Sequence, residues 1–477
     1  MGLRARLRRR RSFAVRWPAV AIAVAAGLCA ATPAGAAEWT TFGRDTGRSN
    51  ENPLETTLSP ATAPALREAW TAPLDGVVTA QPLVVTGVRA TGGRRASLVL
   101  TATEHGEVSA HDATTGALVW RHRVPTRQTR CPDMPKGVYG VSSTPVVDRR
   151  AGRVLVAAAD GRVHGLSLTT GRPLRGWPVR VTPAPARDYV WGALALRAGR
   201  LYAATASHCA NAFFRGRIVA IDVRRARVAH TWFSLSPRLR GAGMWGWGGV
   251  TVDPSSGDLF VATADSLGPT AHERRADSIV RLSSTLHVRA YNRPRAIADV
   301  QDAEFGGAPV LLDAAGCPPL LAVVHKSGAL VLYDRDRIPA GPRQLLQIGR
   351  PGNLGAFGTY AWSAAARTLF VANNTTGDLP HGLDALALQP DCTLSLSWSA
   401  PVGPEPALLS PPVVANGVVY LATGFGRDVW ALDALTGRAL WTSPPTDGAL
   451  YGGPTVANGR LYVAGWDEKL RAYAPGA

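Results

Sequence analysis

The sequence predicts an all-β fold: an eight-bladed β-propeller of four-stranded antiparallel blades, closed by an N-terminal strand. Three observations predict it. A turn motif, Asp-x-x-Thr-Gly followed by Trp, recurs along the chain, most clearly at residues 112–120 and 433–441. Short apolar strands recur in groups about every 40–50 residues, which is the spacing of propeller blades. Gly (50) and Pro (36) are abundant among the 477 residues, as many short strands joined by turns require.

The turn motif predicts the outer half of each blade. Its Asp can accept hydrogen bonds from local backbone amides, and its Gly can adopt positive φ, so the motif joins two antiparallel strands. We expect the Trp ring to cover the turn of the neighbouring blade and its indole N–H to find an acceptor there. Weaker copies of the motif span residues 165–177, 220–232 and 385–398.

Counting inner strands predicts eight blades. The last blade ends at Tyr473 after three strands, and residues 66–70 are expected to supply its fourth. Closing the ring in this way leaves no exposed sheet edge. A seven-bladed ring with one irregular insertion is the alternative. The inner strands are expected to begin near Ala80, Ser143, Trp191, Gly248, Gly307, Ala356, Pro411 and Gly453.

Four of the five cysteines follow residue 36, and an even number in an exported chain indicates disulfides. The predicted blade register places Cys131, in the connection from blade one to two, and Cys209, between the second and third strands of blade three, on one face. It places the loops that carry Cys317 and Cys392 on the opposite face. The register therefore favours Cys131–Cys209 and Cys317–Cys392 among the three pairings that four cysteines allow.

Residues 1–36 have the pattern of a signal peptide, with an Arg-rich start, an apolar stretch over residues 18–28 and Ala34-Gly35-Ala36 before the cleavage point. Arg10-Arg11-Ser12-Phe13 fits the twin-arginine pattern, and an ordinary secretory signal is the alternative. The apolar stretch is shorter than the ~20 residues that span a bilayer. We expect one exported domain, residues 37–477, in the extracellular space or cell envelope, with no membrane segment after cleavage.

The formal net charge of +18 is carried almost entirely by arginine, since the chain has only three lysines. No basic run is interleaved with aromatic residues, which argues against nucleic acid as a partner. Dispersed surface charge is the favoured interpretation, and attraction to anionic cell-surface polymers is the alternative. We expect a monomer whose partner is an envelope protein or a small-molecule ligand.

The repeats, together with the opening segment Trp39 to Asp45, resemble the PQQ-repeat (quinoprotein alcohol dehydrogenase-like) β-propeller superfamily. The resemblance covers essentially the whole mature chain. It implies the propeller fold, and it leaves the activity open, because the superfamily includes both PQQ-dependent dehydrogenases and non-enzymatic assembly or binding proteins.

The resemblance implies five site residues. Trp247 would stack beneath the quinone, and Lys326 would polarise a quinone carbonyl. Asp302 would be the catalytic base, and Asp265 would be a calcium ligand. Asn211 takes the place of a calcium-binding Glu. That replacement weakens the metal site, and neither the family's vicinal cysteine pair nor a haem site is present. Structural roles as core, turn or cap residues are the alternative for each candidate.

Two functions remain open on the sequence alone. The first is a non-catalytic scaffold of the cell envelope or extracellular space that binds a ligand or a protein. The second is a PQQ- and calcium-dependent alcohol or sugar dehydrogenase with an altered metal site. Convergence of Trp247, Asp265, Asp302 and Lys326 at one mouth of the central channel would favour the dehydrogenase.

Overall fold

The computed structural model describes residues 1–2, 37–89, 95–207, 209, 213–267, 275–295, 297, 304–352 and 360–476. The chain separates into two compact units, Met1–Gly35 and Ala36–Ala477, and the second is described here. The predicted signal peptide lies outside the described residues, apart from residues 1 and 2. None of the helices in the described part has the length and hydropathy that crossing a membrane requires.

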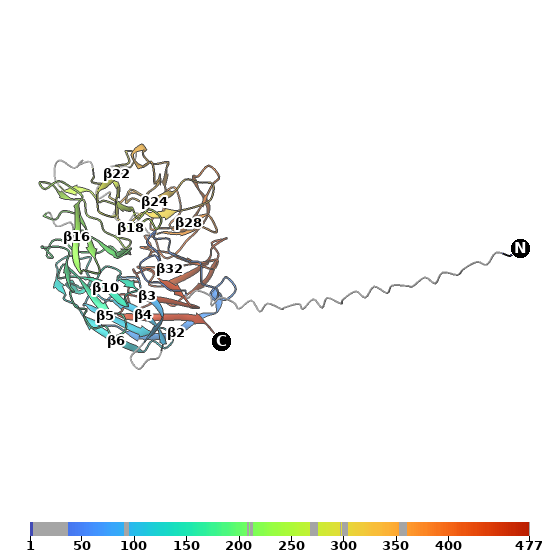
Figure 1. Ribbon diagram of the computed structural model, residues 1–477, viewed down its shortest axis with the longest axis horizontal. Coiled ribbons are helices and arrows are strands. Elements are labelled where there is room, and N and C mark those ends of the chain that lie inside the picture. Colours follow the sequence, from blue (N-terminus) through green and yellow to red (C-terminus); the bar gives the residue numbers. More distant parts are fainter. Residues whose placement is uncertain are drawn as a thin grey trace. The chain divides into compact units, whose positions relative to one another are not determined.

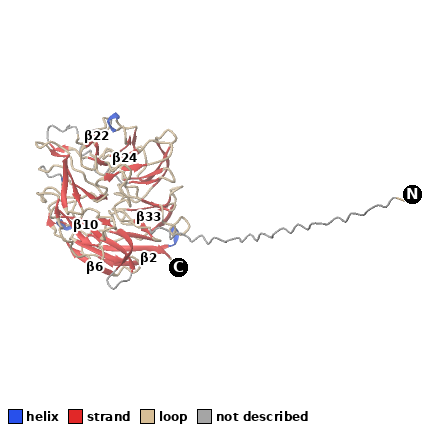
Figure 2. Ribbon diagram, viewed as in Figure 1, coloured by secondary structure: helices blue, strands red, loops and turns tan. Residues whose placement is uncertain are grey.

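The second unit is built from eight four-stranded antiparallel sheets, which follow one another in chain order around a ring (Figure 1). The eight-bladed prediction is therefore confirmed. Strands dominate (Figure 2), and three short 3-10 helices, η1 (Ala63–Ala65), η2 (Pro135–Gly137) and η4 (Ile338–Ala340), lie among the described connections. The inner strand expected near Ala356 begins at Tyr360 in the described residues, since Ala356 itself lies outside them.

The first four blades each run from an inner strand to an outer strand in sequence order. Two-stranded ribbons, β7 (Arg127–Gln128) with β8 (Val138–Tyr139) and β17 (Arg240–Gly241) with β20 (Ser266–Leu267), decorate the connections. The strands of these four blades are β3 (Leu83–Arg89), β4 (Arg95–Ala102), β5 (Glu107–Asp112), β6 (Leu118–Arg123); β9 (Val146–Asp148), β10 (Arg153–Ala158), β11 (Arg162–Ser167), β12 (Val179–Arg180); β13 (Ala195–Arg197), β14 (Arg200–Ala204), β15 (Arg217–Asp222), β16 (Arg227–Phe233); β18 (Thr251–Val252), β19 (Leu259–Ala262), β21 (Ile279–Leu282) and β22 (Val288–Asn292).

The last four blades follow the same order, except that the eighth takes its outer strand from the N-terminal part of the chain. Strand β2 (Leu66–Pro73) pairs antiparallel with β37 (Lys469–Pro475), which confirms the predicted closure. The remaining strands are β23 (Val310–Leu312), β24 (Leu320–Val324), β25 (Ala329–Asp334), β26 (Gln344–Gln347); β27 (Tyr360–Ser363), β28 (Thr368–Asn373), β29 (Gly382–Leu388), β30 (Leu394–Ala400); β31 (Val413–Ala415), β32 (Val418–Ala422), β33 (Val429–Asp433), β34 (Ala439–Thr442); β35 (Thr455–Ala457) and β36 (Arg460–Ala464).

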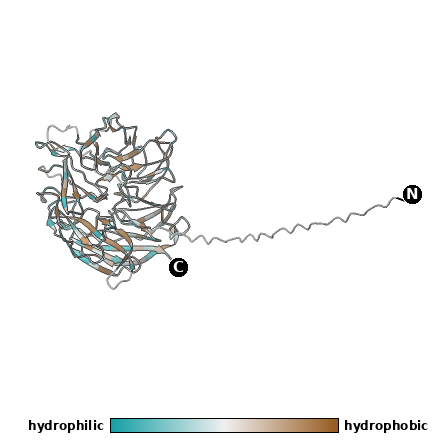
Figure 3. Ribbon diagram, viewed as in Figure 1, coloured by the Kyte–Doolittle hydropathy of each residue, from teal (hydrophilic) through white to brown (hydrophobic). Residues whose placement is uncertain are grey.

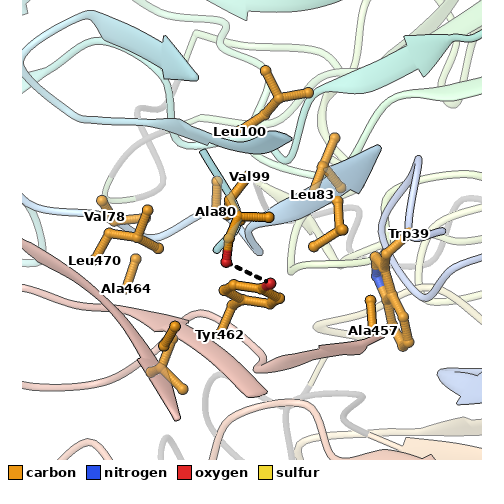
Figure 4. Close-up of a cluster of buried hydrophobic side chains, with 14 of the residues drawn as sticks. Trp39, Val78, Ala80, Leu83, Val99, Leu100, Ala457, Tyr462, Ala464 and Leu470 are labelled. Carbon is orange, nitrogen blue, oxygen red and sulfur yellow. Dashed lines mark hydrogen bonds between the residues drawn. The ribbon is translucent and has the colours of Figure 1, made fainter. Parts of the chain in front are cut away.

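The core lies between the blades, where the apolar side chains of neighbouring sheets meet. Hydrophobic and hydrophilic residues mix along the strands (Figure 3), and the outer strand of each blade is the most exposed. At the closure, Tyr462 and Leu470 of blade eight share a cluster with Leu83, Val99 and Leu100 of blade one (Figure 4). Burying this apolar surface stabilises the closed ring by roughly 25 cal/mol per Å².

Tryptophans of outer strands link three pairs of neighbouring blades in the described residues. The Trp120 ring lies over Gly171 of blade two, so close that a Cβ added at Gly171 would come within 2.4 Å of it. The predicted indole hydrogen bonds form in three cases: Trp70 to the Ala113 carbonyl at 3.3 Å, Trp120 to Leu168 at 2.9 Å and Trp398 to Ala434 at 3.2 Å.

Trp232 departs from this pattern. Its indole nitrogen is buried and has no hydrogen-bond partner in the described part of the chain. The corresponding turn of blade four, residues 283–287, reads Ser-Ser-Thr-Leu-His and lacks the Thr-Gly of the motif. The predicted bond therefore depends on the turn that receives the indole as well as on the tryptophan.

The segment Trp39–Asn52, named here the central segment, circles the propeller axis and touches the inner side of every blade. Its last two residues form β1 (Glu51–Asn52), which pairs parallel with β31. The buried Arg48 donates to the carbonyls of Phe42 and Val250, which ties the segment to blade four. In blade order, hydrogen bonds join Trp39 to Val84, Thr40 to Val147, Thr41 to Leu194, Thr46 to Val252, Gly47 to Leu311, Ser49 to Trp362, Asn50 to Val414 and Asn52 to Val456.

Both expected disulfides are present, with Cys131 bonded to Cys209 and Cys317 to Cys392. In an antiparallel four-stranded blade, the connections after the second and fourth strands emerge on one face, and those after the first and third emerge on the other. Cys131 follows the fourth strand of blade one and Cys209 the second strand of blade three, whereas Cys317 and Cys392 follow a first and a third strand. The two disulfides therefore lie on opposite faces.

Candidate functional site

A cavity of about 530 Å³ opens on the face that carries the Cys131–Cys209 disulfide. The described lining residues come from connections that follow second and fourth strands. Phe42 of the central segment packs with Trp247 and Ala193, so the central segment closes the channel beside the cavity. The volume lies within the range of small-molecule sites.

Tryptophans form one wall of the cavity. Trp191 and Trp245 stack with ring centroids 5.2 Å apart and planes 13° from parallel, and Trp247 lies 5.9 Å from Trp191 at a tilt of 53°. Trp466 lines the cavity from blade eight. The buried indole nitrogens of Trp247 and Trp466 have no hydrogen-bond partner among the described residues. The wall therefore offers flat apolar surface to the cavity, while these two indole nitrogens are themselves buried.

An ion pair, Lys326 with Glu304, lies against this wall. Lys326 Nζ is 3.1 Å from Glu304 Oε1 and 4.6 Å from the centre of the Trp245 ring. The backbone N–H of Asp265 donates to the other oxygen of Glu304 at 3.4 Å. Lys326 is almost completely buried, and a buried ammonium needs such a carboxylate partner. This network holds Lys326, Glu304 and Asp265 together although they come from three connections.

Glu104, after the second strand of blade one, lines the cavity as a separate acid. Its carboxylate accepts hydrogen bonds from the hydroxyls of Thr79 (3.1 Å) and Ser142 (3.0 Å) and from the Gly140 backbone N–H (3.2 Å). Burial raises the pKa of Glu104 to about 7, and the three donors only partly oppose that rise. Glu104 can therefore exchange a proton near neutral pH.

Three of the five candidates from the sequence meet in this cavity. Trp247, Asp265 and Lys326 all line it, whereas Asp302 and Asn211 lie outside the described residues. The Cys131–Cys209 disulfide, expected on structural grounds alone, also lines it.

Several lining residues were not predicted from the sequence, Glu304 and Glu104 among them, although Glu104 had a detectable signal. Glu104 follows Ala-Thr at the end of a second strand, and Asp265 follows Thr-Ala at the equivalent point of blade four. A comparison of equivalent positions among the blades would have found Glu104. Trp191 and Trp245 stack only because two connections meet in space.

The lining fits a flat, conjugated, acidic cofactor such as PQQ. The indoles can stack on it, and Lys326 supplies a positive charge. For calcium, Asp265 and Glu304 supply hard oxygen ligands of the type that this ion prefers. Lys326 already neutralises part of the charge of Glu304, so Asp265 is the stronger ligand of the two.

Comparison with known proteins is consistent with this fold and lining. A polyvinylalcohol dehydrogenase from Pseudomonas sp is 25% identical over 468 residues, which cover 85% of this chain and 70% of that protein. Quinohemoprotein alcohol dehydrogenases from Pseudomonas putida and Comamonas testosteroni both superpose with a TM-score of 0.69 at 16% identity, over 92% of this chain and 80% and 81% of theirs. BamB from Moraxella catarrhalis superposes with a TM-score of 0.57 at 14% identity, over 86% of this chain and 97% of that one.

The solved structures show the shared fold alone. The family model described as outer membrane protein assembly factor BamB, a PQQ-repeat model, matches residues 56–240 and 387–476. These two stretches make up more than half of the chain, and they include the first and the eighth blades. The chain therefore belongs to the PQQ-repeat β-propeller family.

Proposed function

We propose that this protein is an exported quinone-dependent dehydrogenase that oxidises an alcohol in the cavity beside Trp247. The observation that carries the proposal is the meeting of Trp247, Asp265 and Lys326 in one cavity, which the resemblance to quinoprotein dehydrogenases requires. These residues come from the blade three to four connection and from the second-strand loops of blades four and five.

The chain's own residues have separate tasks in this proposal. The tryptophan wall holds and orients a flat ring and excludes water from its face. Lys326 places a positive charge where electron density builds up on a ring oxygen during reduction. Glu304, held by Lys326, and Glu104 are the described carboxylates that can accept the proton of a bound alcohol. PQQ, when bound, supplies the two-electron acceptor for the hydride.

We also propose that the protein is exported. The two disulfides are compatible with an oxidising compartment, and residues 1–36 have the pattern of a signal peptide. We infer that the mature domain acts outside the cytoplasm, where an alcohol from the environment can reach the cavity directly.

A non-catalytic binding scaffold is the second candidate. The match to the BamB family model favours it, and so does Asn211, which stands where the resemblance expects a calcium-binding Glu. In that case the cavity would bind a ligand without oxidising it. The two candidates differ in whether a quinone bound in the cavity is reduced.

Titration of the mature protein with PQQ and calcium, followed by tryptophan fluorescence, tests the proposal. We expect saturable quenching, because the quinone would stack on the tryptophan wall, and dye reduction on addition of an alcohol from a panel. Trp247→Phe should weaken the quenching, while Trp441→Phe, on the outer strand of blade seven, should leave it unchanged. Absence of quenching at high PQQ excess would reject the dehydrogenase. Quenching without dye reduction would favour the scaffold.

A further inference from the structure

A second cavity, of about 430 Å³, lies on the same face and shares a wall with the first. Cys131, Cys209 and Tyr189 line both cavities, so the disulfide and the tyrosine separate them. The second cavity, named here the arginine pocket, lies between the β7–β8 ribbon and residues 185–187 of the next connection. The proposed oxidation of an alcohol does not use it.

The lining of the arginine pocket is strongly cationic. Arg127, Arg130 and Arg187 line it, and no Asp or Glu is among its described lining residues. None of the three arginines forms an ion pair with a residue in the described part of the chain. The three arginines are exposed, so solvent and salt screen part of the repulsion between their guanidinium groups, and an anion between them would relieve the rest.

The surroundings hold charges of both signs. Asp133 lies against the shared disulfide wall, with its Oδ2 3.7 Å from Cys131 Sγ and 3.9 Å from Cys209 Sγ. Asp188, next to Arg187, is buried and already paired with Arg217. Burial lowers the pKa of Arg217, Asp188 opposes that change, and the nearby charge of Arg187 lowers it further. Burial and then the charges of Arg217 and Arg240 likewise lower the pKa of Arg215. Among the described residues no carboxylate forms an ion pair with Arg127, Arg130 or Arg187, so a bound anion would supply a partner that these three arginines lack.

Neutral groups complete a site for an oxyanion. Gln128 and Thr129 line the arginine pocket and can donate hydrogen bonds. Tyr139 donates its hydroxyl hydrogen to the Pro185 carbonyl at 2.6 Å, which fixes one side of the pocket to the other. Arginine binds carboxylate, sulfate and phosphate groups through paired N–H donors, so the residue type matches the ligand class.

We propose that the arginine pocket binds a small organic acid through its carboxylate, as a site separate from the cavity beside Trp247. The pocket volume suits a small molecule and is too small for a folded partner. Sulfate and phosphate share the relevant chemistry, and the experiment separates them from carboxylates. Because the two cavities share the disulfide wall, a bound acid would lie directly beside whatever occupies the tryptophan-lined cavity.

Calorimetric titration of the mature protein with succinate at low ionic strength, without PQQ, tests the proposal. We expect binding of one succinate, no binding of neutral succinamide, and weaker binding of sulfate and phosphate than of succinate. Arg127→Gln, Arg130→Gln and Arg187→Gln should each weaken succinate binding about tenfold. Arg438→Gln, which removes an exposed arginine in a turn on the opposite face, should leave it unchanged.

Three results would overturn the proposal. The first is equal succinate binding by the Arg127→Gln, Arg130→Gln, Arg187→Gln triple variant, with its folding verified by denaturant unfolding. The second is equal binding of succinamide. The third is displacement of succinate by PQQ at one-to-one stoichiometry, which would assign the arginines to the acid groups of the quinone. The succinate titration itself contains no PQQ and measures no oxidation. Its outcome therefore does not depend on whether the dehydrogenase proposal holds.

Discussion

The two faces of the propeller use the same strands but differ in how the strands are joined. On the face opposite the cavity, short turns such as residues 113–117 repeat one motif, and a tryptophan from the preceding blade covers the turn. On the cavity face, connections such as residues 124–145 are long and unlike one another. The comparison teaches that repetition stabilises one face, while irregular connections carry the chemical groups of the other.

The two disulfides give the sharpest test of this comparison. They close loops of nearly equal length, with sequence separations of 78 and 75 residues, so each should stabilise the fold by a similar amount, about 4 kcal/mol. We expect equal losses of unfolding free energy in the Cys131→Ser, Cys209→Ser and the Cys317→Ser, Cys392→Ser double variants, measured by denaturant unfolding.

Only the first double variant should alter ligand binding, because Cys131 and Cys209 line both cavities whereas Cys317 and Cys392 line neither. Titration with PQQ and with succinate measures this difference. Equal binding losses in both variants would contradict the separation of roles between the faces.

Trp120→Ala should lower the unfolding free energy by about 3 to 4 kcal/mol, since the buried ring packs on Gly171 and its N–H bonds the Leu168 carbonyl. Trp120→Phe keeps much of the ring and should lose less. Ligand binding at the cavity should be preserved in both variants, because Trp120 faces the opposite side. A loss below 1 kcal/mol for the alanine variant would show that the tryptophan contacts do not link the blades.

The buried Glu104 predicts a pH-dependent stability that originates on the cavity face. Its pKa rises from 4.5 to about 7 on folding, so between these pH values the folded state keeps a proton that the unfolded chain loses. This contribution favours folding below pH 4.5 and is lost as the pH rises to about 7, by up to about 3 kcal/mol.

Glu104→Gln should therefore unfold at a higher temperature than the parent at pH 8 and at a similar temperature at pH 4. Glutamine can keep all three contacts, because Thr79 can accept a hydrogen bond in place of donating one. Thermal unfolding across this pH range makes the measurement. Parallel pH profiles for the two proteins would mean that Glu104 is already ionised at pH 5.

Lys326→Gln should have the smallest effect, a loss of about tenfold in PQQ affinity, because it removes one charge from the tryptophan wall. Lys469→Gln is the matched control, since Lys469 also pairs with a carboxylate, Asp447, but does not line the cavity. Fluorescence titration compares the two variants. An equal affinity of both for PQQ would remove Lys326 from the proposed site.

Much of the ring could be predicted because its signals are local. The Asp112–Trp120 and Asp433–Trp441 motifs, the spacing of the strands and the missing fourth strand of blade eight all follow from short-range turn chemistry and strand alternation. The disulfide pairs followed from the blade register. The path of the central segment could not be predicted, because Trp39–Asn52 makes single hydrogen bonds to eight distant strands instead of a local repeat.

The sequence by itself determined the eight-bladed fold, its closure by β2 and three cavity residues, Trp247, Asp265 and Lys326. Only the tertiary structure decided that Glu304 pairs with Lys326, that Trp191 stacks on Trp245 and that three arginines surround one pocket. The physical reason is the range of the interactions. Turns and strands are specified by neighbouring residues, whereas the cavity wall is assembled from connections that meet only after the ring has closed.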